Sequence, residues 1–146
     1  MKQKEIEVII DNILFIKSIV FKSLVNATGV KDKISPGIYY VMLVLDKFGA
    51  LSMSRISKEI AIPKPNVTIL VDKLISGGLA ERIPGKKDRR IIEIKLTKKG
   101  LNTKKEVDKT LKEHTFQKLF SLSPPDIKLL SELLSKVRNI FEKIPK

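Results

Sequence analysis

The chain has 146 residues, among them 29 lysines and arginines, 16 aspartates and glutamates and no cysteine, which gives a formal net charge of +13. The lack of cysteine excludes disulfides, thiolate zinc sites and redox sensing by a thiol within this sequence. The positive charge points to a polyanionic partner, and a charged share of 31% argues against a membrane protein.

Residues 5–28 are predicted to form a long helix that ends near Gly29 and is apolar over most of its circumference. In so short a chain, a second subunit is the natural cover for such a helix. The alternative is the central helix of a monomeric bundle. Charged residues such as Asp11 and Lys17 interrupt the apolar run and no cleavage site follows it, so we expect neither a membrane span nor a signal peptide, and a cytoplasmic location.

Serine and proline signals mark the helices that follow. Ser35 and Pro36 begin a helix that ends at Gly49, and Ser52 can cap a shorter one. The prolines at 63 and 65 then restart the chain as another helix, since proline fits only the first helical turn. One buried stripe of this helix is predicted from the residues at helical spacing, which are Val67, Leu70, Val71 and Leu74.

A basic hairpin is predicted next. Residues 79–83 are expected to form its first strand, and in the second Ile92, Ile94 and Leu96 alternate with Glu93 and Lys95. The tip between the strands reads GKKDRR. Residues 82–99 include eight basic and two acidic side chains, so positive charge gathers on and beside the hairpin. Two short helices followed by a basic hairpin are the plan of a winged helix-turn-helix.

Two more helices are predicted after the hairpin. Thr97 can cap a lysine-rich helix that extends to Phe120, and Ser123 can cap a final helix whose apolar residues continue at helical spacing to Ile144. Apolar helices therefore stand at both ends of the chain.

The predicted fold class is mainly α with a small β-wing. Residues 1–146 are expected to form a single domain, with the winged helix-turn-helix at about 35–97. N- and C-terminal dimerisation helices at about 5–28 and 98–144 would flank it.

With these residues in view, the sequence resembles the MarR family of transcriptional regulators. The resemblance rests on residues 52–100, above all on the DRR and LTKKG pieces, and on the order of the helices around them. It implies a homodimer of triangular outline that binds double-stranded, pseudo-palindromic operator DNA, most often as a repressor, and releases it on a small-molecule or redox signal. Ile69 stands where the family often has arginine, so the family's base contacts are not carried over directly. The cysteine that oxidation-sensing members use is missing, which removes that class of signal.

The outer side of the helix after Pro63 is the candidate reader of DNA. In a major groove, Asn66 can bond an adenine edge, Thr68 a base or phosphate, and Ile69 a thymine methyl group. Lys64 and Lys73 are the only cations there, so guanine recognition by arginine is hard to build. We therefore expect an A·T-rich palindrome with half-sites about one helical turn apart. A solvated helix face is the alternative, although it leaves an exposed isoleucine unexplained.

The hairpin tip and the helix capped by Ser52 supply further candidates. By the family resemblance, Asp88 and Arg90 match an Asp-x-Arg wing pattern in which the arginine enters a narrow minor groove. The neighbouring cations, expected near phosphates, are Lys86, Lys87 and Arg89. Ser52 and Ser54 can offer donors to a phosphate, although capping alone explains Ser52. A basic solvated turn is the alternative for the tip.

A small aromatic or phenolic effector is expected to bind between the first helix and the winged part. The candidate residues are Phe15, Lys17, Tyr39, Tyr40 and Met42, with ordinary core packing as the alternative for the aromatics. No nucleophile with a base, no phosphate loop and no metal-ligand set around the single histidine, His114, is present, so we expect no enzyme, no cofactor and no metal. The other readings are a winged-helix protein-interaction or architectural module without a specific operator, and a basic protein of membrane surfaces, which the hairpin's charge disfavours.

Overall fold

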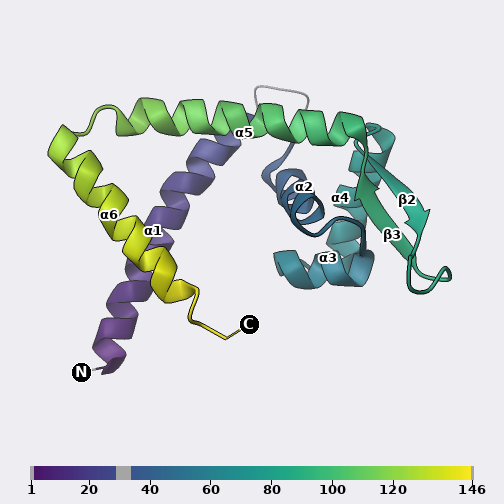
Figure 1. The fold of residues 1–146 in the computed structure, drawn as a ribbon, viewed down its shortest axis with the longest axis horizontal. Coiled ribbons are helices and arrows are strands. Elements are labelled where there is room, and N and C mark those ends of the chain that lie inside the picture. The colour runs from purple at the N-terminus through teal and green to yellow at the C-terminus, as the bar shows by residue number, and fades with distance from the viewer. Residues whose placement is uncertain (1, 29–33, 146) are drawn as a thin grey trace.

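The computed structural model describes residues 2–28 and 34–145, which form a winged lobe and three long helices (Figure 1). The winged lobe comprises residues 34–96. In chain order the elements are α1 (Lys2–Thr28), α2 (Pro36–Phe48), β1 (Leu51–Ser52), α3 (Met53–Ile60), α4 (Lys64–Ser76), β2 (Ala80–Pro84), β3 (Ile92–Leu96), α5 (Lys98–Leu119) and α6 (Pro124–Phe141). This mainly helical architecture with a small antiparallel sheet confirms the predicted fold class.

The predicted caps begin four of the helices. In each case a side-chain hydroxyl accepts a hydrogen bond from the backbone N–H three residues later, and the four caps are Ser35, Ser52, Thr97 and Ser123. Helix α4 instead begins after Pro63, with Pro65 in its first turn and no side-chain cap. Gly49 ends α2 with a φ of +79°. Gly29, expected to end α1, lies outside the described residues.

Helices α2, α3 and α4 enclose the core of the winged lobe. The side chains with no exposed surface are Val41, Met42, Ile56, Val67, Val71 and Leu74. Full burial of one such side chain stabilises the fold by about 1.5–3 kcal/mol. Leu70, the fourth residue of the predicted stripe on α4, is partly buried against this core. The stripe therefore turns the opposite side of α4 toward solvent.

The predicted hairpin is present and belongs to a three-stranded sheet of order β1-β3-β2. Ala80 lies opposite Leu96 and Pro84 opposite Ile92. The third strand, β1, pairs Leu51 with Ile94. Strand β1 was not predicted, because two residues are too few to show alternation.

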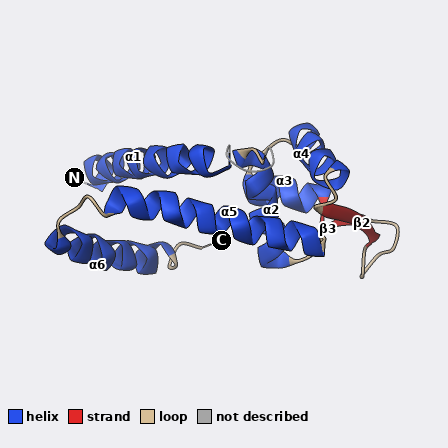
Figure 2. Ribbon diagram, turned by 90° about the horizontal axis from the view of Figure 1, so that it is seen from above, coloured by secondary structure: helices blue, strands red, loops and turns tan. Residues whose placement is uncertain are grey.

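The long helices leave much of their apolar surface uncovered. In Figure 1, α1 and α6 both extend below α5. Seen from above in Figure 2, α1 lies along one flank of α5 and α6 along the other. Near the end of α1, Ser23 and Leu24 are buried, and Lys118 Nζ of α5 donates to Ser23 Oγ at 3.0 Å. Large apolar side chains from Ile6 to Phe21 are nevertheless exposed, and α6 has no buried residue. The monomeric bundle considered for α1 is therefore wrong.

Two further observations concern the helices as single elements. Helix α6 ends at Phe141, so Ile144, expected on this helix, lies beyond it. Among the described helices, none is both long and apolar enough to cross a bilayer.

Candidate DNA-binding surface

The solvent-facing side of α4 carries the residues predicted to read bases. All five are exposed, namely Lys64, Asn66, Thr68, Ile69 and Lys73. Ile69 keeps 56% of its surface exposed although it is apolar. The only acid on α4, Asp72, accepts a hydrogen bond from Arg82 Nη2 of β2 at 2.7 Å. This ion pair, which no local sequence pattern predicts, compensates the one negative charge on α4 and joins that helix to the hairpin.

At the tip of the hairpin, Asp88 orients Arg90. The Arg90 backbone N–H donates to Asp88 Oδ1 at 3.0 Å, and its Nε and Nη2 donate to Oδ1 and Oδ2 at 3.1 Å each. The side-chain and then the backbone hydrogen bonds from Arg90 lower the pKa of Asp88, so this carboxylate stays charged. The Arg90 side chain is 90% exposed, and a guanidinium has five N–H donors, so three remain available to a ligand.

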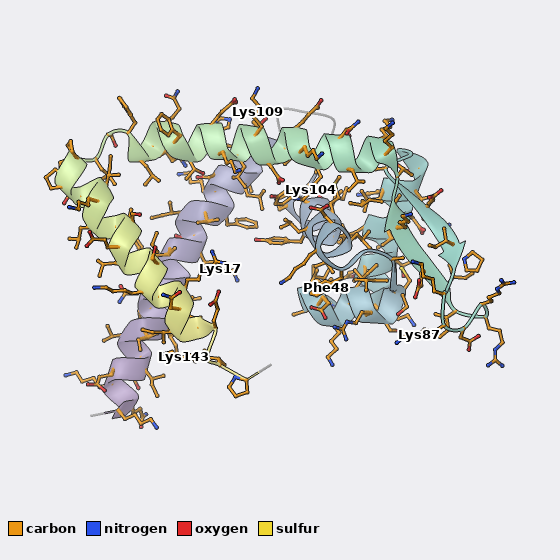
Figure 3. The ribbon with its side chains drawn as sticks, in the orientation of Figure 1. Lys17, Phe48, Lys87, Lys104, Lys109 and Lys143 are labelled. Atoms are coloured by element: carbon orange, nitrogen blue, oxygen red, sulfur yellow. The ribbon has the colours of Figure 1, made fainter. Side chains whose placement is uncertain are left out.

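The turn that carries this pair needs a glycine. Gly85 N–H donates to the Ile91 carbonyl at 2.7 Å, and a Cβ at position 85 would lie 2.7 Å from the Asp88 carbonyl oxygen. Around this tight turn Lys86, Lys87 and Arg89 are exposed (Lys87 is labelled in Figure 3). Four cations and one ion-paired acid therefore project from a single loop.

The predicted serines of α3 lie at its start, on the side of the lobe near β1. Ser52 Oγ accepts from Arg55 N–H at 3.3 Å, so its cap role is occupied, whereas Ser54 is exposed. Beyond them a hollow of 460 Å³ is lined by Lys47, Phe48, Arg55, Lys58 and Glu59. Glu59 pairs with Arg55 at 2.6 Å, which leaves two further cations beside the hollow. The residues that line this hollow were not predicted, because an i,i+4 pair such as Arg55 and Glu59 on a short helix is ordinary surface charge.

The five residues proposed to hold an effector occupy different environments. Phe15 is 65% exposed, and Lys17 lies on the side of α1 that faces the winged lobe (Figure 3). Tyr40 is 37% exposed, but Met42 has no exposed surface. Tyr39 is buried and donates its hydroxyl hydrogen bond to Asp108 Oδ1 at 2.7 Å; burial and then this bond raise its pKa. In this conformation Met42 and Tyr39 therefore contact other protein groups. A ligand between α1 and the winged lobe would meet Lys17 and Tyr40 first, because Phe15 lies about 200° around α1 from Lys17.

Helices α1 and α6 share an apolar hollow of 280 Å³. It is lined by Ile9, Asn12, Ile13, Ile16, Val137, Ile140 and Phe141. Except for Asn12, these side chains are large and apolar and keep 40–60% of their surface exposed. Exposed apolar area of this extent marks a contact surface. Within residues 2–28 and 34–145, no group of three or more His, Cys, Asp or Glu is placed to hold a metal ion.

Comparison with known proteins adds three findings. The MarR family model matches residues 34–91. The HTH-type transcriptional repressor MdtR of Bacillus subtilis is 33% identical over 70 residues, which are 48% of this chain and 45% of MdtR, so the match spans less than half of that relative. The transcriptional regulator BldR from Sulfolobus solfataricus is 24% identical with a TM-score of 0.76, covering 99% of both chains.

A fourth similarity is to a complex. A mutant of MarR from E. coli, solved with operator DNA, is 21% identical with a TM-score of 0.67, covering 91% of this chain and 95% of that one. At these identities the solved structures show that the fold is shared. They cover α1, α5 and α6 as well as the winged lobe, since each spans at least nine-tenths of the chain.

Proposed function

We propose that the chain, whose residues 34–91 match the MarR family model, is a member of that family and a sequence-specific DNA-binding transcriptional regulator. It acts as a homodimer on a pseudo-palindromic, A·T-rich operator. Repression is the favoured mode, because a dimer bound across a promoter blocks access to it. The protein works in the cytoplasm, where the DNA is, and it is not an enzyme.

One observation carries the proposal: the exposed side of α4 and the basic hairpin tip are joined into one surface. The Asp72–Arg82 bridge ties α4 to β2, and the cations at the tip of that hairpin are all exposed. The helix fits a major groove, and the tip fits the minor groove beside it. Ser54, Arg55 and Lys58 on α3 are suited to the phosphates that border the major groove.

The exposed apolar surface of α1 and α6 supports the homodimer. Apolar side chains on both helices surround the 280 Å³ hollow, and a second copy of the same helices would cover them. A two-fold dimer presents two winged lobes, which matches a palindrome with half-sites about 34–36 Å apart.

Selection of duplexes from a random pool tests the proposal directly. We expect enrichment of an A·T-rich palindrome whose affinity falls steeply with salt, because lysines and arginines displace counterions from phosphates. Enrichment of no sequence, with binding absent or insensitive to salt, would instead favour a protein-interaction or architectural module.

The hairpin tip offers a paired prediction. Replacing Arg90 with Ala should weaken binding about tenfold on operators with A·T-rich flanks and much less on G·C-rich flanks, because a narrow minor groove attracts the guanidinium. Replacing Lys86 with Ala should weaken binding to all sequences alike and reduce the salt slope by about one. Titrations on both operators at several salt concentrations separate the two roles. Equal losses for Arg90→Ala on both flanks would make Arg90 one more phosphate contact.

An aromatic carboxylate such as salicylate is the proposed effector class. Tyr40 and the cationic Lys17 offer aromatic and charged contacts between α1 and the winged lobe, whereas Phe15 lies about 200° around α1 from Lys17. At millimolar concentration such a ligand should raise the melting temperature and weaken operator binding. If neither quantity changes across a set of phenolic acids, this effector class is wrong.

A further inference from the structure

An ion-pair cluster around the buried Lys104 joins the winged lobe to α5. Lys104 Nζ of α5 lies 3.0 Å from Asp46 Oδ2 of α2 and 2.7 Å from Asp108 Oδ2, one turn along α5. The Tyr39 hydroxyl of α2 donates to the other oxygen of Asp108 at 2.7 Å. We call these four residues the Lys104 cluster. It connects two turns of α5 with two turns of α2.

Lys104 differs from the other lysines of α5. It is 9% exposed, whereas the rest of the lysines on this helix are exposed. Figure 3 shows Lys104 between α5 and α2, and Lys109 on the other side of α5. Burial alone lowers the pKa of Lys104, but the hydrogen bonds and charges of Asp108 and Asp46 outweigh this and raise it. The ammonium group is therefore charged and held by two carboxylates.

The position of the Lys104 cluster along α5 allows it to set the direction of this helix. The start of α5 is fixed to the lobe, since Thr97 Oγ1 donates to the Gly78 carbonyl at 2.7 Å. A helix attached only at its start can still tilt, whereas a second attachment about two to three turns later fixes its direction. Directional hydrogen bonds set this angle more sharply than apolar packing, which tolerates small slides.

The direction of α5 matters because this helix leads from the lobe to α6. With 22 residues α5 is about 33 Å long, so a tilt of about 6° about its fixed start displaces its far end by about 3.4 Å. That distance equals about one base pair along DNA. We propose that Lys104 is a positioning residue whose ion pairs fix the angle between the winged lobe and the dimerisation helices. It thereby sets the half-site spacing that the dimer accepts. This inference rests on the proposed function.

Selection from a random duplex pool, run in parallel on three proteins, tests this inference. The wild type and the control variant Lys109→Met, which changes an exposed lysine of the same helix, should each enrich palindromes of one spacing. Lys104→Met should enrich the same half-site at several spacings. On the wild-type operator its affinity should fall about tenfold, while its affinity for a duplex with one half-site should change less than about threefold.

Two more variants separate positioning from stability. Asp46→Asn removes one carboxylate charge at a half-exposed site and keeps the side-chain shape, so it should broaden the spacing even if Lys104→Met folds poorly. Lys104→Arg retains the charge and should restore a narrow spacing. A purely structural role would lower the melting temperature and weaken full and half operators equally, with the spacing unchanged, and would overturn the inference. If the wild type enriches no palindrome, the proposed function fails, and this inference fails with it.

Discussion

Replacing Val137 with Asp is expected to convert the proposed homodimer to a monomer. Val137 lies in the centre of the apolar stripe of α6 and lines the hollow shared with α1, with 44% of its surface exposed in the single chain. A carboxylate there would lose its hydration when a second copy covers the stripe. The dimer dissociation constant should rise at least about 100-fold, which corresponds to about 2.7 kcal/mol. Light scattering on the wild type should give twice the chain mass of 16.5 kDa, and on the variant that mass once.

Asn139→Asp is the matched control for this variant. Asn139 is exposed and lies two residues further along α6, about 200° around the helix. The substitution Asn139→Asp therefore adds the same negative charge on the opposite side of α6. We expect it to remain dimeric and to bind the selected palindrome as the wild type does. Operator binding should be lost with the dimer in Val137→Asp. A Val137→Asp protein that remains dimeric would place the dimer contact elsewhere.

Replacing Gly100 with Ala is expected to destabilise the winged lobe strongly. Gly100 is buried in the first turn of α5, where a Cβ would overlap the carbonyl oxygen of Leu79. That oxygen also accepts the Thr97 N–H at 3.0 Å, so the backbone there has little freedom to move. Overpacking against backbone should cost about 3 kcal/mol, equal to a fall in melting temperature of about 10 °C. Thermal unfolding followed by circular dichroism measures this.

Gly77→Ala is a control from the same junction. Gly77 has a φ of −80°, and the nearest atom to an added Cβ is the Lys73 carbonyl oxygen at 3.4 Å. We therefore expect its stability to stay within about 1 kcal/mol of the wild type. If both variants lost similar amounts of stability, position 100 would have no special requirement for glycine.

The candidate site could be predicted from sequence where a pattern is local. The stripe of α4 is set by 100° per residue, so the burial of Val67, Val71 and Leu74 implies the exposure of Ile69 on the other side. The proximity of Asp88 and Arg90 is also local, because a single residue separates them in one turn. Their roles in binding DNA remain predictions.

Pairs distant in sequence could not be predicted in this way. Asp72 and Arg82 are ten residues apart, one on a helix and one on a strand. In the sequence, each of them looks like an ordinary charged surface residue. The LTKKG piece contained Gly100, but only its contact with Leu79 explains why a helix tolerates a glycine that costs about 1 kcal/mol. Tyr39 and Met42 were proposed to face a ligand, whereas the packing of α2 against its neighbours buries both.

By itself, the sequence determined the order of the helices, their caps and the basic hairpin. These features depend on contacts within three or four residues, as the bond from Arg55 N–H to Ser52 Oγ illustrates. The tertiary structure alone decided that β1 joins the sheet and that Lys104 lies buried between two acids. The Tyr39–Asp108 bond, which spans 69 residues, belongs to the same group. The physical reason is that such contacts need chain segments brought together by the burial of a shared core, which periodicity and capping signals do not encode.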